Sequence, residues 1–138
     1  IDVCQIGTAY EKIHQASVEV LTDGLLSLGL LKGSLKKNIE SETYKRFYRH
    51  KTGHWLGLDV HDVGEYKLGG VSRQLEAGMV FTIEPGLYIS PGTAGVPDKY
   101  QGIGIRIEDD ILMTQKGAEV LTADVPSEVE AIEDLMAD

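Results

Sequence analysis

The sequence lacks several features that would place a protein in a class at once. Cys4 is the only cysteine among its 138 residues, which excludes an intrachain disulfide and a cysteine-cluster metal site. It contains no apolar run of the length that a transmembrane helix needs. Because a single cysteine is typical of a reducing compartment, we expect a cytoplasmic protein.

Positive charge is scarce as well. Lys and Arg number 13 against 22 Asp and Glu, which gives a formal net charge of -9. Nucleic acids and anionic membrane surfaces bind proteins rich in Lys and Arg, so we expect neither as a partner. The hydrophobic share of 42% is enough for a core, and the length fits one domain. The chain begins at Ile1 rather than Met, and we interpret it as part of a longer polypeptide.

Hydrophobic periodicity predicts a long helix over about residues 9–28, with one apolar stripe packed on a sheet. Three signals support it: apolar residues at helical spacing from Ile13 to Leu28, a capping-box pair at Thr8 and Glu11, and a stop at Gly29. We expect His14, which lies on this helix, to be a surface or boundary residue.

The rest of the chain has the texture of short strands separated by glycine. β-rich runs occur at Phe47-Tyr48, Trp55-Leu56, 80–83 and 103–107. We also expect a short helix over 33–42, a loop over 90–102, a hairpin over 112–121 and a closing helix over 127–136, capped by Ser127 and Glu130. Helix, strands and helix in this order predict an α+β fold with an antiparallel sheet covered on one face.

Histidine is concentrated in one segment. Three of the four histidines, His50, His54 and His61, fall between positions 50 and 61. On a strand, His50 and His54 would share a face because their separation is even. Imidazoles at this density indicate metal binding or proton transfer, and the alternative is a hydrogen-bonded polar loop.

Two further segments place charge where the pattern looks buried. Glu84 ends the apolar run 79–83, although it could also point into solvent before the turn that follows. Arg106 and Glu108 share the strand face opposite the isoleucines, as a metal site or a cross-strand ion-pair ladder would require. One histidine and two glutamates that converge on a divalent ion would suit manganese, cobalt or zinc.

At these same residues the sequence resembles the pita-bread metallopeptidases and, within them, the Xaa-Pro aminopeptidases (aminopeptidase P). Three long stretches carry the resemblance in order: 53–64, 75–89 and 102–110. The resemblance implies half of a pita-bread fold, which is a curved antiparallel sheet with helices on its outer face. Residues 1–138 would be the C-terminal portion of the catalytic domain.

The resemblance also implies a dinuclear site, most often manganese, that activates a water molecule to attack the scissile carbonyl. His54, Glu84 and Glu108 match ligands, with Glu108 bridging the ions and Glu84 also accepting a proton. His61 matches a histidine that contacts substrate, His50 one that lines the pocket, and Arg106 an arginine that orders the carboxylates. Lys51 stands where the family commonly has glycine, and the family's two aspartate ligands precede this chain.

The implied activity is removal of an N-terminal residue that precedes proline, from peptide substrates with proline at the second position. Two alternatives stay open: a prolidase that cleaves Xaa-Pro dipeptides, and a non-catalytic module that binds a protein partner. Without the two aspartates, we expect this chain alone to be inactive and to bind metal weakly or not at all. We further expect uncovered apolar surface to make it a homo-oligomer.

Overall fold

A computed structural model describes residues 1–137 of the chain. Its three α-helices are α1 (Glu11–Ser27), α2 (Leu35–Glu40) and α3 (Val129–Met136). Its strands are β1 (Lys67–Leu68), β2 (Val71–Ser72), β3 (Val80–Ile83), β4 (Gly86–Tyr88), β5 (Gly104–Arg106), β6 (Asp109–Thr114) and β7 (Gly117–Val120). Short 3₁₀ helices span Thr43–Arg46 and Asp98–Tyr100.

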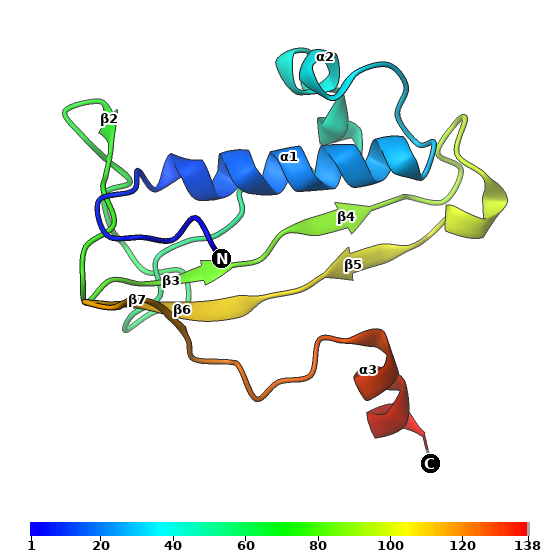
Figure 1. Ribbon diagram of the computed structural model, residues 1–138. Coiled ribbons are helices and arrows are strands. Elements are labelled where there is room, and N and C mark those ends of the chain that lie inside the picture. The colour runs from blue at the N-terminus through cyan, green and yellow to red at the C-terminus, as the bar shows by residue number, and fades with distance from the viewer. Residues whose placement is uncertain (138) are drawn as a thin grey trace.

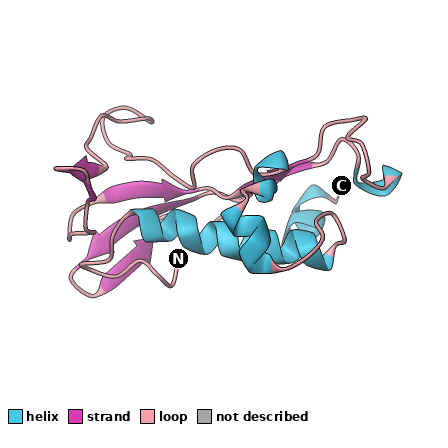
Figure 2. Cartoon of the chain, turned by 90° about the horizontal axis from the view of Figure 1, so that it is seen from above, coloured by secondary structure: helices cyan, strands magenta, loops and turns pink. Residues whose placement is uncertain are grey.

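All strand pairs are antiparallel. Within residues 1–137 they form the ladders β1-β2, β3-β6-β7 and β4-β5. Because β4 follows β3 after Pro85, and β5 runs directly into β6, two of these ladders continue one another as a long ribbon (Figure 1). The hydrogen bond from Ile107 N to Pro85 O, at 3.4 Å, ties the ribbon together at this break. α1 runs along the ribbon (Figures 1 and 2), and the α+β prediction is confirmed.

The long helix forms where the sequence predicts it, but its ends differ in how they are capped. Gly29 has a φ of +72°, and its left-handed conformation stops the helix as predicted. The predicted capping box is wrong, because the N-cap residue Tyr10 makes no side-chain cap hydrogen bond. Glu11 N donates instead to Ser72 Oγ at 3.1 Å, so β2 satisfies the first free amide of the helix.

The buried face of α1 also departs from the predicted stripe. Ile13, Val18 and Leu25 are buried, whereas Val20 is 70% exposed. Val20 lies two residues from Val18, which on a helix is a rotation of about 200°. It therefore points away from the ribbon.

Several of the predicted later elements are confirmed. The run 80–83 is β3, the hairpin is β6-β7, and the helices at 35–40 and 129–136 lie inside their predicted ranges. Phe47-Tyr48 is not a strand, because it follows the 3₁₀ helix Thr43–Arg46 and is buried in the core. The predicted cap of the last helix is wrong too, since the N-cap residue is Glu128 and makes no side-chain cap hydrogen bond.

The core in the described part of the chain has two clusters. One contains Val18, Leu25, Leu30, Leu31, Tyr44, Phe47, Tyr48, Ile89 and Val96. The other contains Cys4, Ile13, Trp55, Leu75, Phe81, Ile83, Ile111 and Met113. Since α1 contributes Val18 and Leu25 to the first and Ile13 to the second, it links the two clusters.

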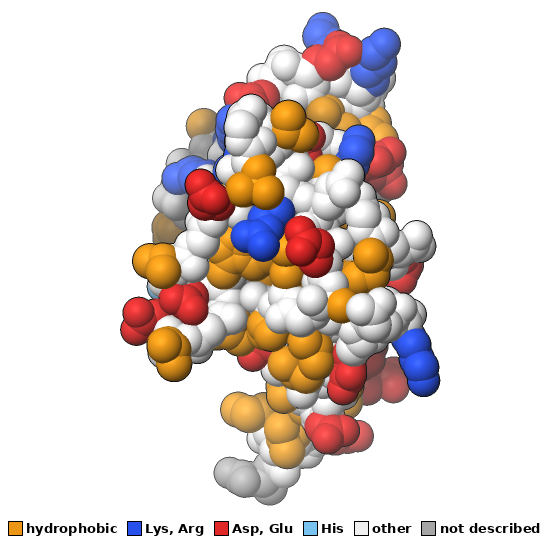
Figure 3. Space-filling view, turned by 90° about the vertical axis from the view of Figure 1, so that its left-hand side faces the viewer, with side chains coloured by type: hydrophobic (Ala, Val, Ile, Leu, Met, Phe, Trp, Pro, Cys, Tyr) orange, Lys and Arg blue, Asp and Glu red, His pale blue; other side chains and the backbone are white. Residues whose placement is uncertain are grey.

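Apolar side chains also lie at the surface. Ile103, Ile105 and Ile107 are 41%, 61% and 49% exposed, so the isoleucine face of β5 is not internal in this chain. Figure 3 shows further hydrophobic side chains between charged ones at the end that carries β1 and β2. Within residues 1–137, no helix combines the length and apolarity that crossing a membrane requires.

Candidate metal centre

The segment that carries His54 lies against β3 without being a strand. Thr82 N donates to His54 O at 2.9 Å, and Glu84 N donates to Thr52 O at 2.6 Å. Gly53 sits between these two bonds, where a Cβ atom would lie 1.8 Å from Thr82 O. Only glycine allows the two backbones to approach so closely.

His54 and Glu84 meet through their side chains. His54 Nε2 lies 3.1 Å from Glu84 Oε1, while His54 Nδ1 lies 3.0 Å from the carbonyl oxygen of Trp55. A carbonyl oxygen only accepts, so Nδ1 carries the proton and the Nε2 of a neutral ring presents its lone pair to the carboxylate. Two acceptors at 3.1 Å repel each other unless a proton or a cation lies between them.

Glu108 completes this group. One ligand atom each from His54, Glu84 and Glu108 lies within 4.8 Å of the others. Glu84 is 8% exposed and Glu108 is exposed at the end of β5. Imidazole nitrogen with carboxylate oxygens is a donor set that fits manganese, cobalt or zinc. The structure thus brings together the three residues that the sequence resemblance implied as ligands.

Two nearby aspartates are engaged elsewhere. The carboxylate of Asp62 accepts hydrogen bonds from Leu58 N at 3.1 Å and Val63 N at 2.8 Å. Asp109 Oδ1 accepts one from Thr122 Oγ1 at 2.7 Å. Each carboxylate therefore stabilises its own loop or strand end, and neither belongs to the group around His54.

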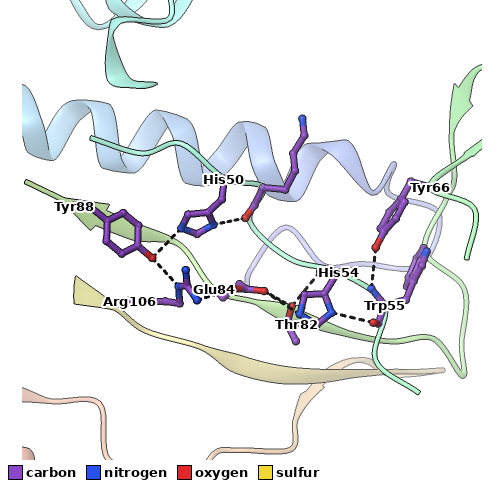
Figure 4. A network of polar contacts seen from close by, with 9 residues as sticks. His50, His54, Trp55, Tyr66, Thr82, Glu84, Tyr88 and Arg106 are labelled. Carbon is purple, nitrogen blue, oxygen red and sulfur yellow. Dashed lines mark hydrogen bonds and ion pairs between the residues drawn. The ribbon is translucent and has the colours of Figure 1, made fainter. Parts of the chain in front are cut away.

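His50 and Arg106 are linked through Tyr88, which the sequence analysis missed. Arg106 Nε donates to Tyr88 Oη at 2.7 Å, and this hydroxyl lies 3.0 Å from His50 Nε2 (Figure 4). His50 Nδ1 lies 2.7 Å from Lys51 O and donates to it, so Nε2 accepts the tyrosine proton. Counting in twos from Glu84 along the chain would have drawn attention to Tyr88.

Arg106 also faces the carboxylate. Its Nη1 lies 3.6 Å from Glu84 Oε2. The hydrogen bond to Tyr88, followed by the charges of Tyr88, Glu84 and Glu108, raises the pKa of Arg106. A permanent positive charge therefore stands beside Glu84, and it offsets part of the cost of holding this carboxylate in a mostly buried place.

The other two histidines lie near the same site. The His61 ring is exposed, with its centroid 4.3 Å from that of His54. His14 is half-buried, as a boundary residue should be, and its Nδ1 lies 2.9 Å from Thr52 Oγ1. Burial, and then the charges of Lys51 and Lys45, lower the pKa of His14.

These side chains surround one cavity of about 660 Å³. Its wall includes His14, His50, His54, His61, Glu84 and Arg106, together with Lys51, Tyr66 and Lys67. His50 and His54 both line it, but the predicted reason is wrong, because residues 50–54 do not form a strand. Glu108 is not part of this wall, although its carboxylate lies close to His54 and Glu84.

The chain is similar to known proteins over most of its length. The sequence matches the family described as Metallopeptidase family M24 over residues 1–115. It is 49% identical over 138 residues to the Xaa-Pro aminopeptidase of Haemophilus influenzae, covering 99% of this chain and 31% of that protein.

Solved structures resemble the chain equally well. Aminopeptidase PepP of Pseudomonas aeruginosa matches with a TM-score of 0.95 and 52% identity, over 98% of this chain and 30% of that one. Aminopeptidase P of E. coli, with the inhibitor Pro-Leu, matches with a TM-score of 0.90 and 49% identity, over 97% and 30%. The pita-bread fold implied by the sequence is confirmed, and the chain spans about three tenths of the length of these relatives.

Proposed function

The chain belongs to metallopeptidase family M24, and from this we propose that it supplies three ligands to a two-metal site that hydrolyses the peptide bond before proline. The observation that carries the proposal is the grouping of His54, Glu84 and Glu108, with ligand atoms within 4.8 Å of one another. The 3.1 Å between His54 Nε2 and Glu84 Oε1, which a proton or a cation must bridge, is a separation that suits two ligands of one ion. Manganese is the ion we propose, with cobalt or zinc as substitutes.

Four polar residues of the cavity have proposed tasks. Bound ions would activate water and stabilise negative charge on the substrate carbonyl. Glu84 accepts the proton of the attacking water, and His61 donates a hydrogen bond to substrate from the exposed side of the cavity. Arg106 holds the Glu84 carboxylate, and His50, fixed by Tyr88, forms part of the wall that receives proline.

The proposed substrates are peptides with proline at the second position. Support comes from relatives that carry the name Xaa-Pro aminopeptidase and from the Pro-Leu complex of the E. coli enzyme. A prolidase would instead accept Xaa-Pro dipeptides. Measuring turnover of an Xaa-Pro-Xaa tripeptide beside the matching Xaa-Pro dipeptide separates the two activities.

We propose that residues 1–138 are the C-terminal portion of a longer catalytic domain, which provides the two aspartates that the family's ligand set requires. The chain alone would then bind one ion weakly and would not turn over peptide, because one bridging carboxylate does not hold a second ion against its hydration. Its exposed isoleucines at 103, 105 and 107 support self-association into a homo-oligomer.

The test is a manganese titration of the 138-residue chain by calorimetry, with a tripeptide assay on the chain and on the longer polypeptide. We expect one weakly bound ion and no turnover for the chain, and two ions with turnover for the longer polypeptide. Two tightly bound ions with turnover in the chain alone would contradict the division of ligands. Absence of metal from both proteins would contradict the proposed function.

A further inference from the structure

The hydroxyl of Thr82 touches both ligand residues of the buried side of the site. Thr82 is 2% exposed on β3. His54 N donates to Thr82 Oγ1 at 3.1 Å, and Thr82 Oγ1 donates to Glu84 Oε1 at 3.0 Å (Figure 4). A backbone N–H can only donate, so the threonine oxygen accepts there and its own proton is directed to the carboxylate.

The carboxylate oxygen that receives this proton is the one that faces the imidazole. Glu84 Oε1 lies 3.1 Å from His54 Nε2, whereas Oε2 lies 3.6 Å from Arg106 Nη1. Thr82 and Arg106 therefore hold opposite oxygens of one carboxylate and fix its rotation. A hydrogen bond between a hydroxyl and an ionised carboxylate is among the stronger ones, and here it is buried.

The same hydroxyl holds the imidazole side. By accepting the His54 amide, it joins the irregular segment at His54 to β3, beside the backbone bond from Thr82 N to His54 O. The remaining ring nitrogen, Nδ1, is held by Trp55 O. The position of Nε2 relative to Glu84 Oε1 is thus set by hydrogen bonds within the chain itself.

We propose that Thr82 is a positioning residue for the metal centre: its hydroxyl presets His54 Nε2 and Glu84 Oε1 at the separation that a divalent cation needs. This inference rests on the proposed function, since it assigns a supporting contact to that site. Thr82 binds neither ion nor substrate in this proposal. Supporting hydrogen bonds of this type typically contribute about 10–100-fold to metal affinity.

A purely structural role for a buried threonine looks different in the same chain. Thr22 is 0% exposed in α1, and its hydroxyl donates to Val18 O at 2.5 Å. It is not part of the cavity wall. Thr22→Val therefore removes a buried hydroxyl with the same change of atoms as Thr82→Val, but away from the ligands.

The experiment measures Co²⁺ binding to the 138-residue chain by its visible absorption spectrum, and Mn²⁺ binding by calorimetry. We expect Thr82→Val to weaken the binding of both ions about 10–100-fold and to change the Co²⁺ spectrum, because the Glu84 carboxylate loses its hydrogen bond. Thr82→Ser keeps the hydroxyl, so its affinity for both ions should lie within about threefold of that of the native chain. Its Co²⁺ spectrum should match the native one. Thr22→Val should leave affinity and spectrum unchanged.

Native affinity in Thr82→Val, or equal loss in Thr82→Ser and Thr82→Val, would overturn the proposal. Should Thr82→Val fail to fold, the comparison is made between Thr82→Ser and Thr82→Ala, which both lack the methyl group. Failure of every variant without the hydroxyl to fold would assign Thr82 to the fold and not to the metal centre. If only the longer polypeptide binds metal, the same variants are compared in it. If the native chain and the longer polypeptide both bind neither ion, the proposed function fails, which is a different result from an unaffected Thr82 variant.

Discussion

Glu84 and Glu108 carry the same carboxylate in different surroundings. Glu84 is 8% exposed, and its two oxygens contact Thr82, His54 and Arg106. Glu108 is exposed, and in the ion pairs of the described residues its carboxylate has no part. One carboxylate is thus oriented by the fold, whereas the other must lose its rotamer freedom when an ion binds, at a cost of up to about 2 kcal/mol.

The difference follows from where the backbone is clamped. β3 and residues 52–54 are joined by backbone hydrogen bonds on both sides of Gly53, and we call this pair of bonds the clamp. Glu108 instead follows β5, at the break between the two ladders of the ribbon. We infer that the chain contains a preorganised half-site and a third ligand that joins it on binding.

The largest expected effect comes from breaking the clamp itself. A Cβ atom on Gly53 would lie 1.8 Å from Thr82 O, which is backbone and cannot rotate away. We expect Gly53→Ala to lower the free energy of unfolding by about 3 kcal/mol or more and to abolish Mn²⁺ binding. Urea unfolding followed by circular dichroism measures the first, and calorimetry the second.

The matched control is Gly24→Ala. Gly24 lies within α1, and a Cβ atom there would meet nothing within 4 Å. Because alanine favours a helix, this change should be neutral or stabilise the chain by up to about 1 kcal/mol. Equal unfolding free energies for the two variants would show that residues 52–54 move away from β3 at little cost.

The next largest effect should separate the two glutamates. We expect Glu84→Gln to weaken Mn²⁺ binding to the chain about tenfold more than Glu108→Gln, because the ordering cost of about 1–2 kcal/mol offsets part of what Glu108 contributes. Calorimetry of both variants measures the ratio. In the longer polypeptide, Glu108→Gln should nevertheless abolish peptide turnover, since an amide does not bridge two cations as a carboxylate does.

Glu119→Gln controls for the loss of one negative charge, because Glu119 is exposed on β7 and outside the metal group. Its Mn²⁺ affinity should match that of the native chain. A greater loss in Glu108→Gln than in Glu84→Gln would contradict the preorganised half-site.

Local patterns in the sequence predicted what depends on local contacts. The helix α1, the strand β3 and the β6-β7 hairpin each follow from spacing and turn residues within a short window. The start of α1 did not follow, because its amide is satisfied by Ser72, which lies 61 positions away. A capping rule that reads four consecutive residues does not see such a partner.

The sequence predicted which residues form the metal group, but not which residues hydrogen-bond to them. Resemblance pointed to His54, Glu84 and Glu108, whereas Thr82 and Tyr88 become visible only once β3 and residues 50–54 are seen side by side. Strand alternation likewise predicted that the isoleucines and Arg106 lie on opposite faces. It did not reveal that the isoleucine face would be exposed, because periodicity distinguishes two faces without telling which one is covered.

The smallest expected effect concerns His14, whose Nδ1 lies 2.9 Å from the side-chain hydroxyl of Thr52. Burial first, then the positive charges of Lys51 and Lys45, lower the pKa of His14 from its ordinary value of 6.5. Below pH 6.5 the unfolded chain therefore binds more protons at this residue than the folded chain. Its contribution to stability is complete above that pH and is lost as the pH falls toward the folded value.

We expect His14→Gln to reduce the fall in unfolding free energy between about pH 6.5 and pH 5 by a fraction of the roughly 1.4 kcal/mol per pH unit that one full proton would give. Urea titrations at half-unit pH intervals measure the slope, which is compared in place of absolute stability because glutamine also changes the contact with Thr52. Thr22→Val, on the same helix and with no titratable side chain, should retain the native slope. If the His14 variant also has the native slope, protonation of His14 does not change the stability of the chain. The contact between His14 and Thr52 then lies outside the preorganised half-site.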